Sequence, residues 1–131
     1  MTLCLDTSAL VKLLVREPET DALRAYLIER PTLRRVACGL VRTELRRTAL
    51  RLSPDLLPAA EQLLASLFLV RVDDPLLDTA GTLGPSIVRS LDALHLAAAL
   101  RVAPVTALVT YDTRMRDAAR SLGLPVAAPG M

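Results

Sequence analysis

Four acidic residues of this chain, here called the four acids, lie inside or beside apolar segments: Asp6, Glu44, Asp92 and Asp112. Asp6 and Asp112 each close a short apolar run, Asp92 opens a long one, and Glu44 lies within a predicted helix. An ionised carboxylate that leaves water costs several kcal/mol or more unless a cation or hydrogen-bond donors compensate it. Four such costs in one small chain predict that the carboxylates share a cation.

The residue types restrict which cation this would be. Four converging carboxylates would repel one another strongly without a divalent ion, and an oxygen-only ligand set favours Mg²⁺ or Mn²⁺ over zinc. No Cys or His pair has the spacing of a zinc site, and we expect Cys4 and Cys38 to be free, buried thiols. The predicted chemistry is therefore a metal-assisted reaction at an acidic site.

The four acids need secondary-structure elements that bring them together. Short apolar runs predict strands, and apolar residues at helical spacing predict helices between them. The expected strands span 2–6, 33–38, 68–72 and 108–111, and the expected helices span 8–16, a segment after Pro18, 39–52, 53–67, 75–83, 90–102 and 113–122. This alternation is typical of a mostly parallel sheet covered on both faces. We predict an α/β fold, a three-layer α/β/α sandwich, with residues 1–131 forming a single domain.

Such a fold would gather the four acids at one edge. Parallel sheets carry their functional loops at the carboxyl ends of strands, and Asp6 and Asp112 each directly follow a strand. Asp92 lies in the first turn of a helix that is apolar nearly all round, so it points into protein or a cleft. Glu44 lies about a quarter turn off the apolar stripe of its helix and can face the edge of that cleft.

Each acid also has a purely structural interpretation. Asp6 and Asp112 could N-cap the helices that follow them, Asp92 could stabilise a helix dipole, and Glu44 could be a solvated helix residue. His95, one turn after Asp92, could be a hydrogen-bonded core residue or a catalytic one. The occurrence of all four acids in this order favours a shared site over four coincidences.

Composition bounds the location and the partners. Apolar residues make up 52% of the chain and the mean hydropathy is +0.39. Charges nevertheless interrupt every apolar stretch well before the roughly 20 residues that a membrane helix needs, and Asp6 interrupts any signal peptide. We expect a cytoplasmic protein without a membrane segment, whose surplus apolar surface is covered by oligomerisation or a partner. A net charge of +2 does not by itself indicate nucleic acid.

Four features together resemble the PIN domain. They are the segments Leu5–Leu10 (LDTSAL), Leu91–Ala97 (LDALHLA) and Val109–Asp112 (VTYD), with Glu44 on a helix in mid-chain. They cover essentially the whole chain in order and spacing, which more narrowly resembles the VapC toxins of bacterial type II toxin–antitoxin pairs. The resemblance implies a metal-dependent endoribonuclease that is a homodimer and is neutralised by a cognate VapB-type antitoxin.

The resemblance also implies roles for the four acids, which match the family's catalytic and metal-binding positions. We expect Asp6, Asp92 and Asp112 to hold the principal Mg²⁺ or Mn²⁺, and Glu44 to orient the attacking water or a second ion. The products would carry a 3′-hydroxyl and a 5′-phosphate.

Neighbouring positions refine this expectation. Thr7, Ser8 and Thr110 match the family's small hydroxyl positions, which support the site through hydrogen bonds. One position departs from the pattern, because many members carry a further acid two or three positions after the fourth, where this chain has Arg114 and Met115. We therefore expect a second metal to bind weakly or only together with substrate.

Two open alternatives remain at this level. Arg47 and Arg51 share a helical stripe with Glu44, where they either receive RNA phosphates or belong to a surface Glu–Arg pair with solvated neighbours. For the whole chain, the alternative function is a non-catalytic PIN-like module that binds RNA or a protein without cutting.

Overall fold

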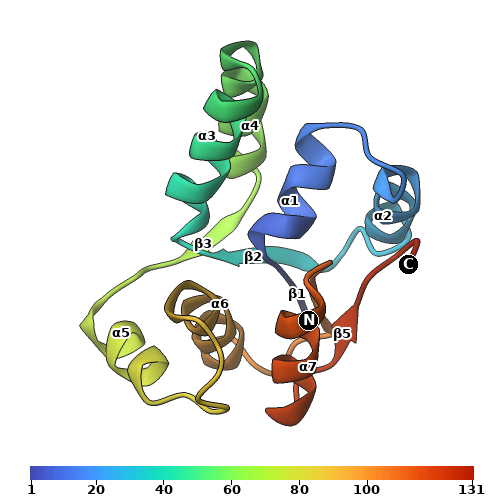
Figure 1. Cartoon of the computed structure of the whole chain (residues 1–131). Helices are drawn as coiled ribbons and strands as arrows, with labels where there is room; N and C mark the ends of the chain where they lie inside the picture. The colour runs from blue at the N-terminus through green and yellow to red at the C-terminus, as the bar shows by residue number, and fades with distance from the viewer.

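A parallel five-stranded sheet runs through the middle of the molecule, with helices on both faces (Figure 1). The structure is a computed structural model that describes residues 1–131. The strands are β1 (Thr2–Leu5), β2 (Arg34–Cys38), β3 (Phe68–Val70), β4 (Ala107–Val109) and β5 (Val126–Ala127), in the order β3-β2-β1-β4-β5. The helices are α1 (Thr7–Leu14), α2 (Thr20–Ile28), α3 (Val41–Leu52), α4 (Leu57–Ala65), α5 (Asp74–Gly81), α6 (Ser90–Arg101) and α7 (Thr113–Ser121), with a 3₁₀ turn at Pro54–Leu56 before α4.

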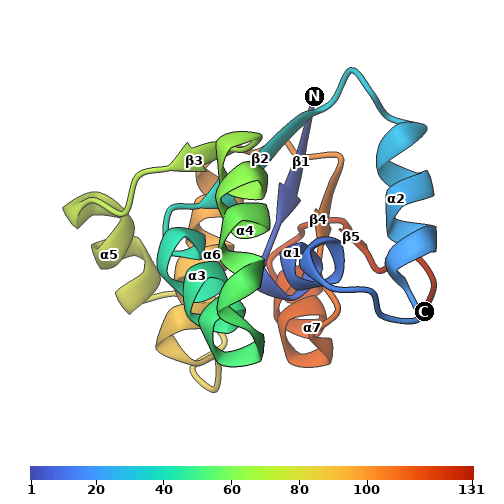
Figure 2. The same cartoon turned by 90° about the horizontal axis from the view of Figure 1, so that it is seen from above.

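Strand residues alternate between apolar cores on the two faces of the sheet. Leu3 and Leu5 of β1 pack with residues of α1 to α4, whereas Cys4 packs with residues of α6 and α7. A third cluster joins β2 and β3 to α5 and α6. Figure 1 shows the two helical layers on either side of the sheet, and α2 and α5 lie at opposite ends of the molecule (Figure 2). The predicted three-layer α/β/α architecture is confirmed, and every strand pair is parallel.

The sequence prediction omitted the edge strand β5, which comprises only two residues. After α7 the chain turns at Gly123, whose φ of +78° lies in the left-handed region that glycine adopts readily. The returning segment then pairs with β4, with Leu108 donating to the Pro125 carbonyl at 2.8 Å and Thr110 donating to the Ala127 carbonyl at 3.1 Å. This pairing holds the end of β4, which leads directly to Asp112.

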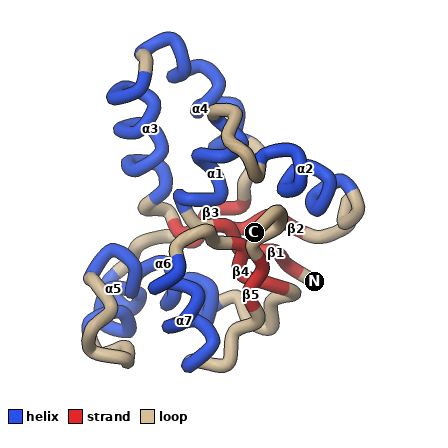
Figure 3. Tube along the Cα trace, turned by 45° about the vertical axis from the view of Figure 1, so that its right-hand side comes forward, coloured by secondary structure: helices blue, strands red, loops and turns tan.

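Gly39 determines how closely the start of α3 approaches the sheet. Its N–H donates to the Val70 carbonyl at 2.7 Å, and a Cβ at Gly39 would lie 2.9 Å from that oxygen. Any side chain would therefore push the β2–α3 connection away from β3. The first turn of α3 carries Glu44, and α3 then extends away from the sheet together with α4 (Figure 3).

Both cysteines are free and buried, as predicted. Burial raises the pKa of the Cys4 thiol to about 12 and also raises the pKa of Cys38. No helix is both long and apolar enough to cross a bilayer.

Candidate active site

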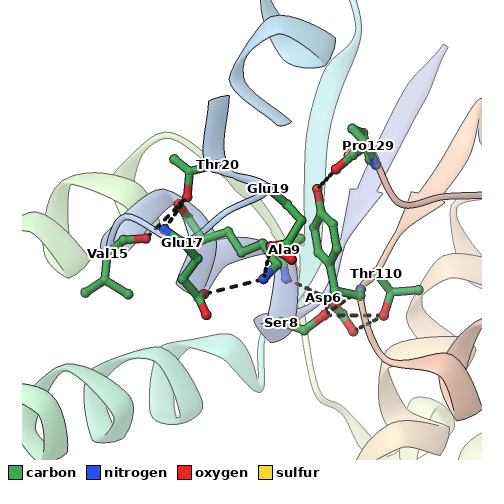
Figure 4. Close-up of polar contacts among 11 residues, drawn as sticks. Asp6, Ser8, Ala9, Val15, Glu17, Glu19, Thr20, Thr110 and Pro129 are labelled. Atoms are coloured by element: carbon green, nitrogen blue, oxygen red, sulfur yellow. Dashed lines mark hydrogen bonds and ion pairs between the residues drawn. The ribbon is translucent and has the colours of Figure 1, made fainter. Parts of the chain in front are cut away.

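Asp6 is a buried carboxylate that hydrogen-bond donors of the protein surround. It follows β1, has only 3% of its surface exposed, and N-caps α1 by accepting from the Ala9 N–H at 3.1 Å. The Ser8 hydroxyl donates to its Oδ1 and the Thr110 hydroxyl to its Oδ2, each at 2.6 Å (Figure 4). Burial raises the pKa of Asp6, and these hydrogen bonds oppose the rise. The interpretation of Asp6 as an N-cap is therefore correct. An N-cap contact does not exclude a second role of the same carboxylate at a reaction site.

The hydroxyl groups of Ser8 and Thr110 also tie the ends of β1 and β4 together. The Tyr111 N–H donates to Ser8 Oγ at 2.9 Å, and the Asp112 N–H donates to Thr110 Oγ1 at 3.2 Å. The sequence analysis expected both residues to form hydrogen bonds near the four acids, and they do so here. Their bonds fix the loop that carries Asp112 relative to Asp6.

Asp112 uses one carboxylate oxygen for the fold and leaves the other without a hydrogen bond. Its Oδ1 N-caps α7 by accepting from the N–H groups of Arg114 at 2.9 Å and Met115 at 3.2 Å. An N-cap contact also holds the carboxylate in a fixed orientation. The second oxygen, Oδ2, is therefore available to a ligand.

Glu44 is oriented by two partners from other elements. The Thr7 hydroxyl donates to its Oε1 at 2.6 Å, and His95 Nε2 lies 2.7 Å from the same oxygen. Burial alone would raise the pKa of Glu44, but the hydrogen bonds from His95 and Thr7 outweigh it and lower that pKa. The structure places His95 in the core, 4% exposed, with its imidazole against this site residue. Thr7 therefore supports Glu44, while Ser8 and Thr110 support Asp6.

Asp92 differs from the other acids because none of its interactions is a hydrogen bond. It lies half-buried in the first turn of α6. Burial raises its pKa, and the neighbouring Asp112 and Glu44 carboxylates raise it further, while His95 and Arg89 act in the opposite direction. Asp92 is thus held close to like charges without a compensating donor.

Three of the four acids line one cavity of about 290 Å³. Its lining consists of Glu44, Arg89, Ser90, Leu91, Asp92 and Asp112, and we call it the acidic cavity. Asp6 does not line it. The structure therefore brings Glu44, Asp92 and Asp112 together around one space and joins Asp6 to them through Thr110 and the β4–α7 loop.

The residues of the acidic cavity fit a hydrated divalent cation. Asp92 accepts no hydrogen bond, and Asp112 has one free oxygen. Burial and then the like charges of Asp112 and Glu44 raise the pKa of Asp92, and a cation would offset both effects. No group of three or more His, Cys, Asp or Glu side chains is arranged so that it could hold a metal ion. A Mg²⁺-type ion usually keeps several water ligands and needs only one or two carboxylates, so a partial ligand set is compatible with it.

The arginines that follow Glu44 on α3 do not pair with it. Arg47 and Arg51 are exposed and form no ion pair. Glu44 turns instead towards His95 and Thr7. The interpretation of Glu44 and these arginines as a surface Glu–Arg pair is therefore wrong. The interpretation that both arginines bind RNA stays a prediction.

Sequence reasoning missed a cluster behind the site, around Tyr111 and Lys12. The Tyr111 hydroxyl donates to the carbonyl of Pro129, which is labelled in Figure 4, at 2.8 Å. The Lys12 ammonium lies 4.7 Å from the centre of the Tyr111 ring. Lys12 also lies 3.0 Å from a carboxylate oxygen of Glu19. The signal available in the sequence was a lone lysine on an otherwise apolar helix. The cluster fastens Tyr111, the neighbour of Asp112, to the end of the chain.

The chain resembles known proteins over nearly its whole length. The family model of the PIN domain matches residues 3–121. Ribonuclease VapC46 of Mycobacterium tuberculosis (strain ATCC 25618 / H37Rv) is 51% identical over 126 residues, which cover 95% of each chain. Ribonuclease VapC47 of Mycobacterium tuberculosis (strain CDC 1551 / Oshkosh) is 42% identical over 130 residues, which cover 96% of each chain.

A solved structure agrees with the fold. The crystal structure of VapBC2 from Rickettsia felis, bound to a DNA fragment from their promoter, superposes with a TM-score of 0.70 at 17% identity. The match covers 97% of this chain and 98% of that one.

Proposed function

The chain belongs to the PIN domain family, and from that premise we propose that it is an endoribonuclease toxin of the VapC type. The relatives named as VapC ribonucleases, 42% to 51% identical over nearly the whole chain, support the reaction class. The observation that carries the proposal is the acidic cavity, where the carboxylates of Glu44, Asp92 and Asp112 meet. Such a space suits an anionic substrate only when a cation neutralises it.

Asp92 and Asp112 would hold Mg²⁺ or Mn²⁺ in the acidic cavity, and Asp6 would add negative charge near the site while its partner Thr110 orients the loop of Asp112. The bound ion would supply an acidified water and neutralise charge on the scissile phosphate. The Thr110 and Ser8 hydroxyls keep Asp6 oriented, and the α7 N-terminus keeps Asp112 oriented. These contacts limit rearrangement of both carboxylates.

Glu44 would orient the attacking water. Thr7 and His95 both occupy its Oε1, so Oε2 is left to accept a hydrogen bond from a water molecule. His95 is then a positioning residue that acts through Glu44. The expected products are a 3′-hydroxyl and a 5′-phosphate.

A VapB-type antitoxin is the proposed partner, and a homodimer is the proposed assembly. Support for a partner comes from the VapBC2 complex that shares the fold. Large apolar side chains on the surface of this chain, including Ile28 at 72% and Leu52 at 52% exposure, are consistent with covered interfaces.

The proposal is tested by incubating the purified chain with total RNA in Mg²⁺, in EDTA, and beside Asp92→Asn. We expect discrete cuts in Mg²⁺ that disappear in EDTA and in the variant. Cleavage that persists in both would refute the acidic cavity as the reaction site.

The same assay separates the non-catalytic alternative. RNA that stays intact while gel shift detects RNA binding, with no Mn²⁺ bound by the chain, would favour a PIN-like binding module over a nuclease.

A further inference from the structure

A second cavity adjoins the acidic cavity. It encloses about 350 Å³. One wall is α7, and the other is the start of α6 together with the segment 85–89 that precedes it. These two helices lie side by side below the sheet (Figure 1). Arg89 and Asp92 line both cavities, so the two spaces share a wall. We call this second space the Arg89–Arg114 cavity.

Two arginines line the Arg89–Arg114 cavity without a direct ion pair, although the charge of Arg89 lowers the pKa of the neighbouring Asp92. Arg89 and Arg114 are exposed and form no ion pair. Of the two acids in the lining, Asp117 lies 3.7 Å from Arg120. Asp92 belongs to the acidic cavity as well, where a bound cation would offset its charge. With that cation bound, the two arginines outnumber the one remaining acid, Asp117, and would favour an anion beside the carboxylates.

Arg114 is joined directly to the proposed reaction site. Its backbone N–H donates to Asp112 Oδ1 at 2.9 Å, which fixes the root of its side chain next to that carboxylate. Arg114 therefore carries a side chain that can bind anions, while its backbone orients the fourth acid.

We propose that the Arg89–Arg114 cavity is a nucleotide subsite, which binds the RNA residue adjacent to the scissile phosphate. This inference rests on the proposed ribonuclease activity. A guanidinium can bind a phosphate through two parallel hydrogen bonds and can stack on a base with its flat face. Pro85 and the 81%-exposed Ile87 add apolar surface at the same wall. Single-stranded RNA offers both groups, because its bases are free to leave the stack.

The test compares Arg114→Ala and Arg89→Ala with a matched control, Arg24→Ala. Arg24 is exposed on α2 and forms no ion pair, so the control removes the same charge far from the site. Wild-type cuts in total RNA are first mapped by sequencing the new 5′ ends. A fluorescent RNA that spans one mapped cut is then used to measure KM and kcat, and the cuts of each variant are mapped again.

We expect Arg114→Ala to raise KM about tenfold with kcat nearly unchanged, the loss typical of one charge-assisted phosphate contact. The nucleotide preference at one position beside the cut should weaken, and Arg89→Ala should change the same position. Mn²⁺ affinity, measured by electron paramagnetic resonance, should stay at the wild-type value in Arg114→Ala. Arg24→Ala should match the wild type throughout.

An unchanged KM with an unchanged cut pattern in Arg114→Ala and Arg89→Ala would overturn the subsite and favour an acidic protein segment as the ligand. Equal losses in Arg24→Ala would also overturn it, because the effect would then be one of net charge. If the wild type cuts no RNA, the proposed function fails, and RNA binding in an Asp92→Asn background decides the subsite separately. There the subsite requires that Arg114→Ala weaken binding and that Arg24→Ala leave it unchanged.

Discussion

Asp6 and Asp92 were predicted to do the same work, yet the protein holds them in opposite ways. Asp6 is 3% exposed and accepts hydrogen bonds from two hydroxyls and a backbone N–H. Asp92 is half-buried, accepts none, and lies near the like charges of Asp112 and Glu44. Hydrogen bonds within the fold therefore offset part of the cost of burying the first carboxylate, whereas no hydrogen bond offsets the burial and repulsion of the second.

This difference separates two tasks that a cluster of acids performs. One carboxylate can organise the loops around a site and contribute to folding, since its partners are built into the chain. Another can be kept ready for a ligand only at some cost in stability, since its repulsion is left uncompensated. Variants at the two positions should therefore have similar effects on activity and different effects on stability.

The largest effect should be on RNA cleavage, and substitutions of Asp6 and Asp92 should both cause it. Asp92→Asn and Asp6→Asn should each lower kcat/KM at least about 100-fold. The first removes charge from the acidic cavity, and the second disturbs the hydroxyl contacts that fix the loop of Asp112. Initial rates on a mapped RNA substrate give this measurement. A variant that keeps wild-type cleavage would remove that residue from the site.

Substitutions of Asp6 and Asp92 should differ in their effect on the free energy of unfolding. Asp6→Ala should lower the free energy of unfolding by about 2–4 kcal/mol, because it removes an N-cap and leaves the buried Thr110 hydroxyl and the half-buried Ser8 hydroxyl without their acceptor. Asp92→Ala should change it by less than about 1 kcal/mol, since no hydrogen bond is lost. Urea unfolding in EDTA compares them, and equal losses would contradict the division.

Variants of His95 test whether this residue acts by orienting Glu44. His95→Ala should lower kcat about tenfold with KM nearly constant, because Glu44 loses a partner that orients it. His95→Gln, which can still donate to Glu44, should recover part of the loss. A failure of the Gln variant to recover activity, with both variants equally folded by circular dichroism, would count against positioning through Glu44.

The pH dependence of stability should expose the repulsion at Asp92. Burial, then Asp112 and Glu44, raise its pKa above 3.8 in the folded chain. The folded state therefore binds this proton more tightly than the unfolded state, so the contribution is present below pH 3.8 and is lost as pH rises through the raised pKa. In EDTA, the Tm of the wild type should fall relative to Asp92→Asn as the pH rises above this value.

Mg²⁺ should reduce that difference in Tm, because the cation compensates the same charges. Parallel pH profiles for the two proteins in EDTA would contradict the assignment of the repulsion to Asp92. Both profiles can be recorded by thermal melts at low ionic strength.

The smallest effect should come from the arginines outside the cavities. Reversing Arg47 and Arg51 to Glu should weaken RNA binding about threefold and flatten its dependence on salt, because phosphate contacts are lost without loss of the site. Fluorescence anisotropy in an Asp92→Asn background measures both quantities. Unchanged binding would identify the two residues as solvated surface charges.

Sequence reasoning predicted the parallel sheet and the sheet edge where Asp6 and Asp112 lie, because both follow from local sequence pattern. Short apolar runs that end in Asp place Asp6 and Asp112 at the same sheet edge whatever the details of packing. The pairing of Glu44 with His95 could not be read in this way, since 51 residues separate them and the contact depends on the packing of α3 near α6. The exclusion of Asp6 from the acidic cavity is likewise a result of tertiary packing.

The buried cysteines make this chain convenient for labelling. Thiol reagents attack the thiolate, and burial raises the pKa of both Cys4 and Cys38 while it blocks access to them. A single cysteine introduced at the exposed Ser86, beside Pro85 and Ile87, would therefore be the one site that a maleimide dye modifies under mild conditions. A fluorophore there would report the arrival of RNA at the Arg89–Arg114 cavity while both native cysteines stay in place.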